Sequence, residues 1–292
     1  MGALEGKVAI VTGAGQGLGR AHAVTLAAEG AAVIVNDVSE ANARTVADEI
    51  SAAGGRAATN TGSVADWAAS KALIDQAVED FGDLHIVVNN AGITRDRMSF
   101  SMDEADFDAV VNVHLKGHFC LSRHAGVWWR EQSKAGTTTP RRIVNTTSEA
   151  GLFGSAGQAN YASAKSGIVG LTWVFARELE RYGVTTNAIA PRARTPMTEH
   201  MDLFKAPADG SFDKYDPVNV SRVVTWLASD RTADINGQVF VVVGGDVYLV
   251  LPPQITNRVR SKEGWTVDSL EAARGELLGD HKPEPPMTTV GA

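Results

Sequence analysis

The chain has 292 residues and a formal net charge of −7, with 44% apolar and 21% charged residues, which is ordinary for a globular protein large enough for one α/β domain. This acidic balance, without any basic run, excludes a surface that follows nucleic-acid phosphates. The single cysteine, Cys120, excludes an intrachain disulfide and a cysteine-built metal site, so we expect a cytoplasmic protein. The longest apolar stretch, residues 239–251, is interrupted by two glycines and an aspartate, so we expect no membrane-spanning helix and no membrane partner.

The first elements predict a nucleotide-binding unit. A β-branched strand at Val8–Val11 leads into a glycine-rich turn over residues 12–19, and an alanine-rich helical pattern follows. Strand, turn and helix in this order place backbone N–H groups and a helix N-terminus against a pyrophosphate. Tight turns use the same residue type, so the glycines alone indicate little. They are spaced G-x-x-x-G-x-G, at Gly13, Gly17 and Gly19.

The next strand, Ala32–Val35, is followed by Asp37, which lies 18 residues beyond Gly19. An acidic side chain at this point accepts hydrogen bonds from the adenosine ribose of a dinucleotide. A capping or turn aspartate is the alternative. In NADP the ribose carries a phosphate, and two like charges about 4 Å apart repel by about 1 kcal/mol in water and about 4 kcal/mol at an effective dielectric of about 20. The sequence therefore predicts NAD as the cofactor.

Strands and helical patterns continue to alternate up to residue 250. We expect further strands at 57–61, 84–88, 142–147, 184–190 and 238–243, and helices at 40–53, before Phe81, at 111–129 and after Asn160. Repeated βα units with nearly continuous apolar strands predict a single doubly wound α/β domain of the Rossmann type. It should have a parallel sheet of about seven strands with helices on both faces.

Two stretches stand outside this alternation. The connection 192–216 mixes Pro, Gly, Met and Phe, and long loops of this kind are commonly lids over a functional site. Its apolar residues suit an acyl chain, a sterol or another apolar alcohol, and they are Met197, Met201, Leu203 and Phe204. We expect residues 1–250 to form the catalytic domain. Residues 251–292 then form an extension with a helix at Val267–Leu278 and a disordered end.

A pair of polar side chains begins the longest helical pattern. Tyr161 and Lys165 lie four apart in a run with apolar residues at helical spacing, so they project from one face of a helix about five turns long. A cation near a phenol favours the phenolate and lowers the phenol pKa from its usual value of about 10. On spacing alone, an ordinary exposed Tyr–Lys pair is the alternative.

Five motifs in this order resemble the short-chain dehydrogenase/reductase family over residues 5–248. They are Thr12–Gly19, Asn89–Gly92, Asn112, Ser148 and Tyr161-x-x-x-Lys165, with Ser148 13 residues before Tyr161. Within the family, Asn89–Arg97 and Gly157–Tyr161 look most like the (3R)-hydroxyacyl-CoA dehydrogenase unit of peroxisomal multifunctional enzymes. They are also similar to the bacterial relatives of that unit, a group that is not sharply separated from 3-oxoacyl-carrier-protein reductases.

The resemblance implies an oxidoreductase that transfers hydride between NAD and a secondary alcohol or ketone, with a 3-hydroxyacyl thioester as the expected substrate. Tyr161 would exchange the proton, and Lys165 would lower its pKa and hold the nicotinamide ribose. Ser148 would bind the carbonyl oxygen, and Asn112 would hold a water between Lys165 and solvent. The alternatives are a hydroxysteroid or other apolar secondary-alcohol dehydrogenase and a non-catalytic NAD-binding sensor. The family's habit of pairing long helices between subunits implies a homodimer or homotetramer.

The resemblance also implies a set of cofactor contacts. These are Gly13, Gln16, Gly17, Leu18, Gly19, Asp37, Ser63, Val64, Asn89, Ala91, Gly92, Tyr161, Lys165, Pro191 and Thr195. Arg192 departs from the Pro-Gly sequence common after this strand, and Ser63 stands where an aspartate is common beside adenine. The guanidinium groups of Arg95, Arg97, Arg192 and Arg194 either meet a phosphorylated carrier such as coenzyme A or are solvated surface charges.

Two histidines, His114 and His118, lie four apart and could share a metal ion. Because the sequence places no third ligand near them, we expect structural or interface roles for both and no metal. Cys120 has no activating base in its neighbourhood, so we expect it to be a small core residue.

Overall fold

The centre of the molecule is a twisted sheet in which the described residues, 2–196 and 202–279 of the computed structural model, form eight strands. The strand order is β3-β2-β1-β4-β5-β6-β7-β8. The first seven strands run parallel and β8 pairs antiparallel with β7. The strands are β1 (Val8–Thr12), β2 (Ala32–Asn36), β3 (Arg56–Asn60), β4 (Ile86–Asn89), β5 (Arg141–Thr146), β6 (Val184–Arg192), β7 (Val239–Val243) and β8 (Asp246–Val250).

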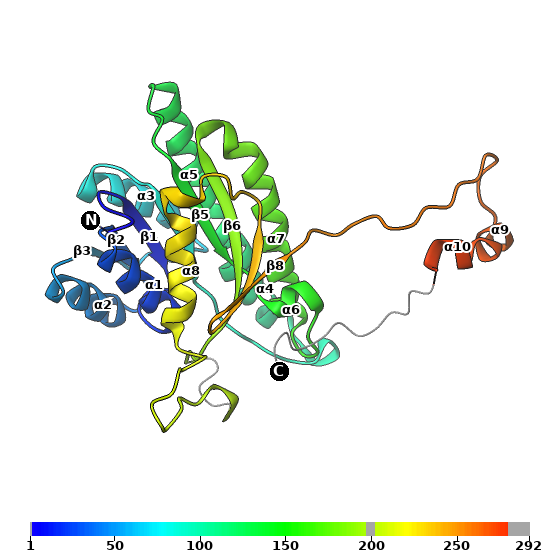
Figure 1. Cartoon of the computed structure of the whole chain (residues 1–292), viewed down its shortest axis with the longest axis horizontal. Coiled ribbons are helices and arrows are strands. Elements are labelled where there is room, and N and C mark those ends of the chain that lie inside the picture. Colours follow the sequence, from blue (N-terminus) through cyan, green and yellow to red (C-terminus); the bar gives the residue numbers. More distant parts are fainter. Residues whose placement is uncertain (1, 197–201, 280–292) are drawn as a thin grey trace. The chain divides into compact units, whose positions relative to one another are not determined.

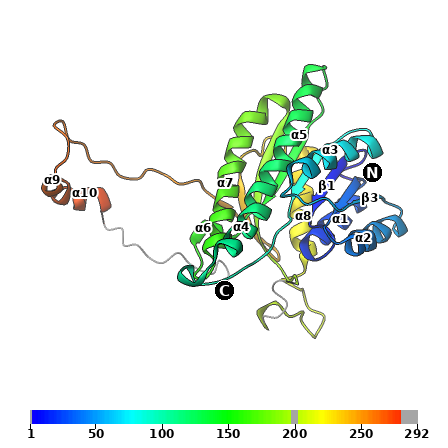
Figure 2. The same cartoon turned by 180° about the vertical axis from the view of Figure 1, so that it is seen from behind.

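Helices cover both faces of this sheet, as predicted. Alternate residues of β1 separate to the two faces: Ala9 and Val11 enter one apolar core, whereas Val8 and Ile10 enter the other. The first face packs against α1 (Gly17–Ala28), α2 (Glu40–Ala52) and α8 (Pro217–Ala228), which lie towards the viewer in Figure 1. The second packs against α3 (Trp67–Phe81), α5 (Gly117–Lys134) and α7 (Ala159–Leu179), seen in Figure 2. The doubly wound α/β fold is therefore confirmed.

The long helix predicted over residues 111–129 contains a change of winding. It begins as α4 (Glu104–Val111), passes through a π-helical turn at Asn112–Lys116 and continues as α5. In this turn the N–H of Gly117 bonds to the carbonyl of Asn112, five residues back. One extra residue in a turn rotates the side chains that follow, and such turns often occur at functional sites. The short helix α6 (Glu149–Phe153) begins at Ser148, whose Oγ accepts a hydrogen bond from the N–H of Ala150.

The eighth strand was not predicted. Gly244 and Gly245 interrupt the apolar stretch that follows residue 238, and they form a two-residue loop that returns the chain beside β7. Gly244 has a φ of 58°, a conformation that side chains disfavour, and two-glycine loops are typical of tight hairpins. The sheet therefore ends in an antiparallel edge strand, beyond the roughly seven strands that were predicted.

The contacts within the chain divide it into two units, Met1–Val250 and Leu251–Ala292. In the second unit the helix predicted over 267–278 is two shorter helices, α9 (Val267–Ala272) and α10 (Arg274–Leu278). Thr266 and Ser269 cap the first of them reciprocally. The end of this extension, 280–292, and the lid residues Met197 and Met201 lie outside the described residues. In the part of the chain that is described, no helix is both long and apolar enough to cross a bilayer.

Candidate active site

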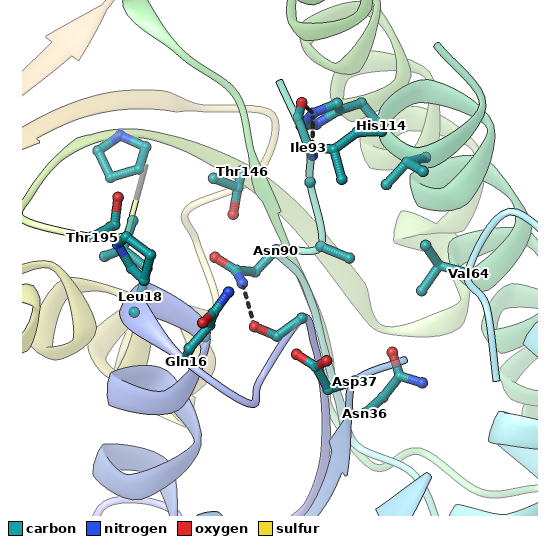
Figure 3. Close-up of a pocket in the computed structure, with 18 of the residues that line it drawn as sticks. Gln16, Leu18, Asn36, Asp37, Val64, Asn90, Ile93, His114, Thr146 and Thr195 are labelled. Carbon is teal, nitrogen blue, oxygen red and sulfur yellow. Dashed lines mark hydrogen bonds between the residues drawn. The ribbon is translucent and has the colours of Figure 1, made fainter. Parts of the chain in front are cut away.

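A cavity of about 390 Å³ opens at the carboxyl ends of the central strands. It lies where the strand order reverses, between β1 and β4, and this is where doubly wound sheets bind their ligands. Figure 3 shows its two ends, with Asn36 and Asp37 at one and His114 with Ile93 at the other. The predicted residues that line it are Gly13, Gln16, Gly17, Leu18, Gly19, Asp37, Ser63, Val64, Ala91, Gly92, Ser148, Tyr161, Lys165, Pro191 and Thr195.

The glycine-rich loop after β1 packs tightly against its neighbours. A Cβ on Gly13 would lie 2.8 Å from Cα of Ala91, and one on Gly19 would lie 2.0 Å from the carbonyl oxygen of Gly13. Side chains therefore cannot replace these hydrogens without moving the backbone. Gly13 and residues 16–19, which include the start of α1, line the cavity, and a helix N-terminus at this place fits the pyrophosphate of a dinucleotide.

The Asn-Asn-Ala-Gly motif uses its second asparagine at this site. Asn90 lines the cavity and donates from Nδ2 to the carbonyls of Thr12 (2.9 Å) and Gly13 (3.2 Å), which ties the loop after β4 to the loop after β1 (Figure 3). Asn89 was predicted as a cofactor contact, but it does not line the cavity. Its side chain is buried and donates to Ser122 Oγ and Asn145 Oδ1, both at 2.9 Å. Alternation of side chains at the end of the strand explains this difference.

Asp37 lies at the opposite end of the cavity from Ser148, Tyr161 and Lys165. Its Oδ2 accepts from the N–H of Gly15 (3.0 Å) and its Oδ1 accepts from the N–H of Ser39 (2.9 Å). A Cβ on Gly15 would lie 2.8 Å from that Oδ2, so a glycine is needed here for the carboxylate to approach the loop. Both backbone bonds hold the carboxylate in place at the edge of the cavity.

Basic residues that could neutralise a phosphate beside Asp37 are engaged elsewhere. The guanidinium of Arg20 makes two contacts with Glu49, at 2.6 and 2.8 Å, and Arg44 pairs with Glu40. Within the described ranges, Lys165 is the one lysine or arginine that lines the cavity.

Ser148, Tyr161 and Lys165 lie together at the other end of the cavity. Ser148 follows β5, whereas Tyr161 and Lys165 lie one turn apart on α7. The Nζ of Lys165 is 5.5 Å from the centroid of the Tyr161 ring and donates to the carbonyl of Thr146 at 2.6 Å. The side chain of Ser148 hydrogen-bonds the phenol of Tyr161, and this bond works to lower the phenol pKa. The geometry therefore gathers a phenol, an amine and a hydroxyl around one point.

Burial sets the protonation of this group. It lowers the pKa of Lys165 to about 7. It also raises the pKa of Tyr161 above its usual value of 10, while the bond to Ser148 acts in the lowering direction and Asp96 in the raising direction. The predicted lowering of the Tyr161 pKa by Lys165 is thus not found in the protein alone. Removal from water favours the neutral form of each group, and a neutral amine does not stabilise a phenolate.

The helix that was expected to present Asn112 presents His114 instead. Asn112 is exposed and does not line the cavity, whereas His114 is 1% exposed and lines it. Residues two apart in a helical turn point to nearly opposite sides of it, so Asn112 and His114 cannot both face one cavity. A sequence signal existed, because Val110, His114 and Leu121 follow the i, i+4, i+11 spacing of one buried face.

Arg192, the last residue of β6, and Arg194, just after it, are engaged within the protein. Arg192 is half-buried and makes a bidentate pair with Glu149, with contacts from 2.6 to 3.0 Å. Arg194 pairs with Asp213 and donates to the carbonyl of Phe204. These two guanidinium groups therefore brace the start of the 192–216 connection and are not solvated surface charges.

The other two arginines, Arg95 and Arg97, are exposed and lie beside Asp106. Of the apolar residues in the predicted lid, Leu203 is exposed and Phe204 is buried against Tyr215, with ring centroids 4.8 Å apart. Neither residue lines the cavity. Thr195, at the start of the same connection, does line it.

Within the described ranges, no three His, Cys, Asp or Glu side chains are grouped so that they could hold a metal ion. His114 and His118 are both buried. Cys120 is a free buried thiol, and burial raises its pKa.

Comparison with known proteins identifies the family. Residues 7–205 match the family described as short chain dehydrogenase. The chain is 49% identical to the hydroxyacyl-CoA dehydrogenase ChsB1 of Mycobacterium tuberculosis, over 96% of this chain and 91% of that protein. It is 39% identical to the peroxisomal hydratase-dehydrogenase-epimerase of Neurospora crassa, over 83% of this chain and 27% of that protein. The crystal structure of a short chain dehydrogenase from Mycobacterium avium matches with a TM-score of 0.88 and 46% identity over the whole of both chains. The chain therefore belongs to the short-chain dehydrogenase/reductase family and is an oxidoreductase that acts on CH–OH groups with a nicotinamide cofactor, NAD or NADP.

Proposed function

We propose that the protein is an NAD-dependent dehydrogenase of 3-hydroxyacyl thioesters. One observation carries the catalytic part of this proposal: Ser148, Tyr161 and Lys165 meet at one end of a single cavity whose other end holds Asp37. A protein that only bound a nucleotide would not need the three reactive side chains at the end remote from Asp37. An enzyme is therefore the better explanation than a non-catalytic sensor.

The choice of NAD rests on Asp37. Its carboxylate is fixed by two backbone N–H groups and so cannot easily turn away from a ribose beside it. It would accept hydrogen bonds from the free hydroxyls of the NAD ribose and repel the additional phosphate of NADP. The pairing of Arg20 with Glu49 supports the same choice, because that guanidinium is already occupied by a carboxylate.

Tyr161, Ser148 and Lys165 would each have a different role in the reaction. The cofactor, when bound, supplies the acceptor or donor of hydride. Tyr161, which burial favours as the neutral phenol, gives its proton to the substrate oxygen in reduction; in oxidation it has first to lose that proton and then takes the hydroxyl proton as phenolate. Ser148 donates a hydrogen bond to the substrate oxygen, where negative charge develops. Lys165 hydrogen-bonds the nicotinamide ribose while its Nζ stays anchored on Thr146.

The substrate class is supported by the relatives. The Mycobacterium tuberculosis relative is a hydroxyacyl-CoA dehydrogenase, and this chain matches 91% of its length. The Neurospora crassa relative contains a dehydrogenase unit by name, and this chain matches a segment of it. A 3-hydroxyacyl thioester carries a secondary alcohol, whose oxygen Ser148 would hydrogen-bond and whose proton Tyr161 would exchange.

A turnover assay with matched variants tests the proposal. NADH formation is followed with a panel of 3-hydroxyacyl-CoAs, hydroxysteroids and simple secondary alcohols. We expect the thioesters to give the highest kcat/KM. Tyr161→Phe should abolish hydride transfer and leave NAD affinity nearly unchanged, whereas Tyr248→Phe on β8 should behave as wild type. Full turnover in Tyr161→Phe, or a preference for hydroxysteroids, would refute the assignment.

A further inference from the structure

A half-buried ion pair lies next to the wall of the cavity without facing into it. Glu149 is the first residue of α6, and Arg192 is the last residue of β6. Their side chains are 18% and 12% exposed, and neither residue lines the cavity. The guanidinium meets both carboxylate oxygens, with Nη2 2.8 Å from Oε1 and Nε 3.0 Å from Oε2. Two such contacts fix the direction of both side chains as well as their separation.

Each member of this pair adjoins residues of the cavity wall. Pro191 and Ala193 both line the cavity, while Arg192 between them does not, as the alternation of side chains along an extended chain leads us to expect. Glu149 directly follows Ser148, which also lines the cavity. The pair therefore joins two segments of the wall that lie at the carboxyl ends of neighbouring strands, β5 and β6.

The strand before Ser148 ends too early to hold it in place. The paired part of β5 ends at Thr146, opposite Ile189 of β6. Ser148 then begins α6, a helix of five residues. A helix this short is not stable by itself, because its first turn has to order several residues for one hydrogen bond. The position of α6 therefore depends on its contacts with neighbouring elements.

Two contacts hold α6 from different elements. A Cβ on Gly151 would lie 2.6 Å from Cβ of Lys165, so the backbone of α6 lies directly against α7. The bidentate pair of Glu149 with Arg192 connects the first residue of α6 to β6. Contacts with α7 and with β6 together determine where α6 begins, and Ser148 is placed at that point.

The place of the Ser148 hydroxyl affects Tyr161. The bond between these two side chains works to lower the phenol pKa, whereas burial raises it. The other titratable groups that face Tyr161 are Lys165 from α7, His114 from the π-helical turn and Asp96 from the loop after β4. None of these three belongs to α6. A shift of α6 would therefore weaken the bond from Ser148 and let the pKa of Tyr161 rise further.

We propose that Glu149 and Arg192 are positioning residues of the reaction, whose bidentate pair fixes the start of α6 against the end of β6 and so places the Ser148 hydroxyl between Tyr161 and the substrate oxygen. A lysine at position 192 would keep the charge but not the planar fork that meets both oxygens of Glu149. The inference rests on the proposed dehydrogenase function.

Variants of the full chain separate this role from a general contribution to stability. Glu149→Gln removes the charge, and Arg192→Lys removes the bidentate geometry. We expect each to lower kcat for oxidation roughly 10- to 100-fold while the affinity for NAD changes by less than about 3-fold. The double variant should be about as slow as the slower single one, because the two residues act as a unit.

The pH profile of oxidation gives a second readout. Oxidation needs the Tyr161 phenolate, so a higher phenol pKa moves the rising limb of kcat/KM to higher pH. We expect this shift in both single variants, in the direction that Ser148→Ala also gives. Asp83→Asn is the matched control, since it breaks the pair with Arg141 at the opposite end of β5. It should lower the melting temperature without moving the profile.

Hydrogen exchange of α6 does not depend on turnover. Peptides that cover residues 147–154 should exchange faster in Glu149→Gln than in wild type. Unchanged exchange there would overturn the inference, as would a wild-type kcat and pH profile in both single variants, an equal shift of the profile in Asp83→Asn, or losses that add in the double variant. Should Glu149→Gln not fold, Arg192→Lys provides the same comparison. A wild-type protein inactive on the whole substrate panel would instead overturn the proposed function and leave the exchange test standing.

Discussion

The Nζ of Lys165 lies 5.5 Å from the centroid of the Tyr161 ring and is anchored on the carbonyl of Thr146 at 2.6 Å. This anchor holds an amine in a buried place where its charge is poorly solvated. The consequence is a pKa lowered by burial from 10.5 to about 7. The proposed reaction needs Lys165, but the folded state disfavours the protonated form of this residue.

Replacing this amine should stabilise the protein while removing its activity. The lowered pKa of Lys165 means that its charged form costs stability fully below about pH 7, and that the cost disappears as pH rises to about 10.5. The shift corresponds to about 5 kcal/mol, from which the unpaired carbonyl of Thr146 subtracts about 1–3 kcal/mol. We expect Lys165→Met to raise the free energy of unfolding by about 2–4 kcal/mol at neutral pH and below.

Urea unfolding at several pH values measures this effect. The gain of Lys165→Met over wild type should shrink as pH rises above about 7 and should change sign between about pH 8 and about pH 10. Lys71→Met is the control, because that lysine is exposed and pairs with Asp75 on the surface of α3. A gain that does not vary with pH would contradict the burial of a titrating amine.

Acid should destabilise the protein well above the pH at which carboxylates titrate. Burial lowers the pKa of His22 and His114 to about 3 and that of His118 well below its ordinary 6.5. The unfolded chain binds these protons near pH 6.5 and the folded one does not, so stability is complete above that pH and is lost as pH falls below it. Each histidine contributes about 1.4 kcal/mol per pH unit. Urea unfolding between about pH 7 and pH 4 should show this loss, and constant stability down to about pH 5 would contradict it.

Removing the carboxylate of Asp37 should change the preference for the cofactor. In Asp37→Asn the side chain keeps an oxygen that can accept from Gly15, but it no longer repels a phosphate on the ribose. Like charges near a protein surface interact by about 1–4 kcal/mol at 4 Å, so we expect the ratio of kcat/KM for NAD over NADP to fall by about 10-fold or more. Steady-state kinetics with both cofactors measures the ratio. Asp66→Asn, at the N-terminus of α3, is a matched control that should leave it unchanged.

The hydroxyl of Ser148 should matter to the chemical step more than to binding. Ser148→Ala removes a donor aimed at the developing charge on the substrate oxygen, and loss of one such donor costs about 2.7–4 kcal/mol, or about 100- to 1,000-fold in kcat. The same change removes the bond from Ala150 that caps α6. Ser63→Ala, at the far end of the cavity, is the comparison. Equal effects of both substitutions on kcat would show that Ser148 has no special place in the reaction.

The framework of this protein could be predicted from the order of its residues. Short β-branched runs such as Val8–Val11 that alternate with helical patterns are typical of a parallel sheet, whose two faces the helices cover. The spacing of Tyr161 and Lys165 predicted their common face on α7 because a helix repeats every 3.6 residues. Helix periodicity depends only on residues that are close together in the chain, so it can be predicted from the sequence.

Tertiary structure decided the chemical environment of the site. One π-helical turn turns Asn112 outward and leaves His114 in the cavity wall, and its extra residue depends on how the helix packs against the rest of the fold. Two glycines after β7 reverse the chain into β8. Burial, which no local pattern reveals, sets the pKa values of Tyr161 and Lys165. Periodicity follows from the covalent chain, whereas solvation depends on every segment that comes to lie around a residue, and that is why only the folded structure determined it.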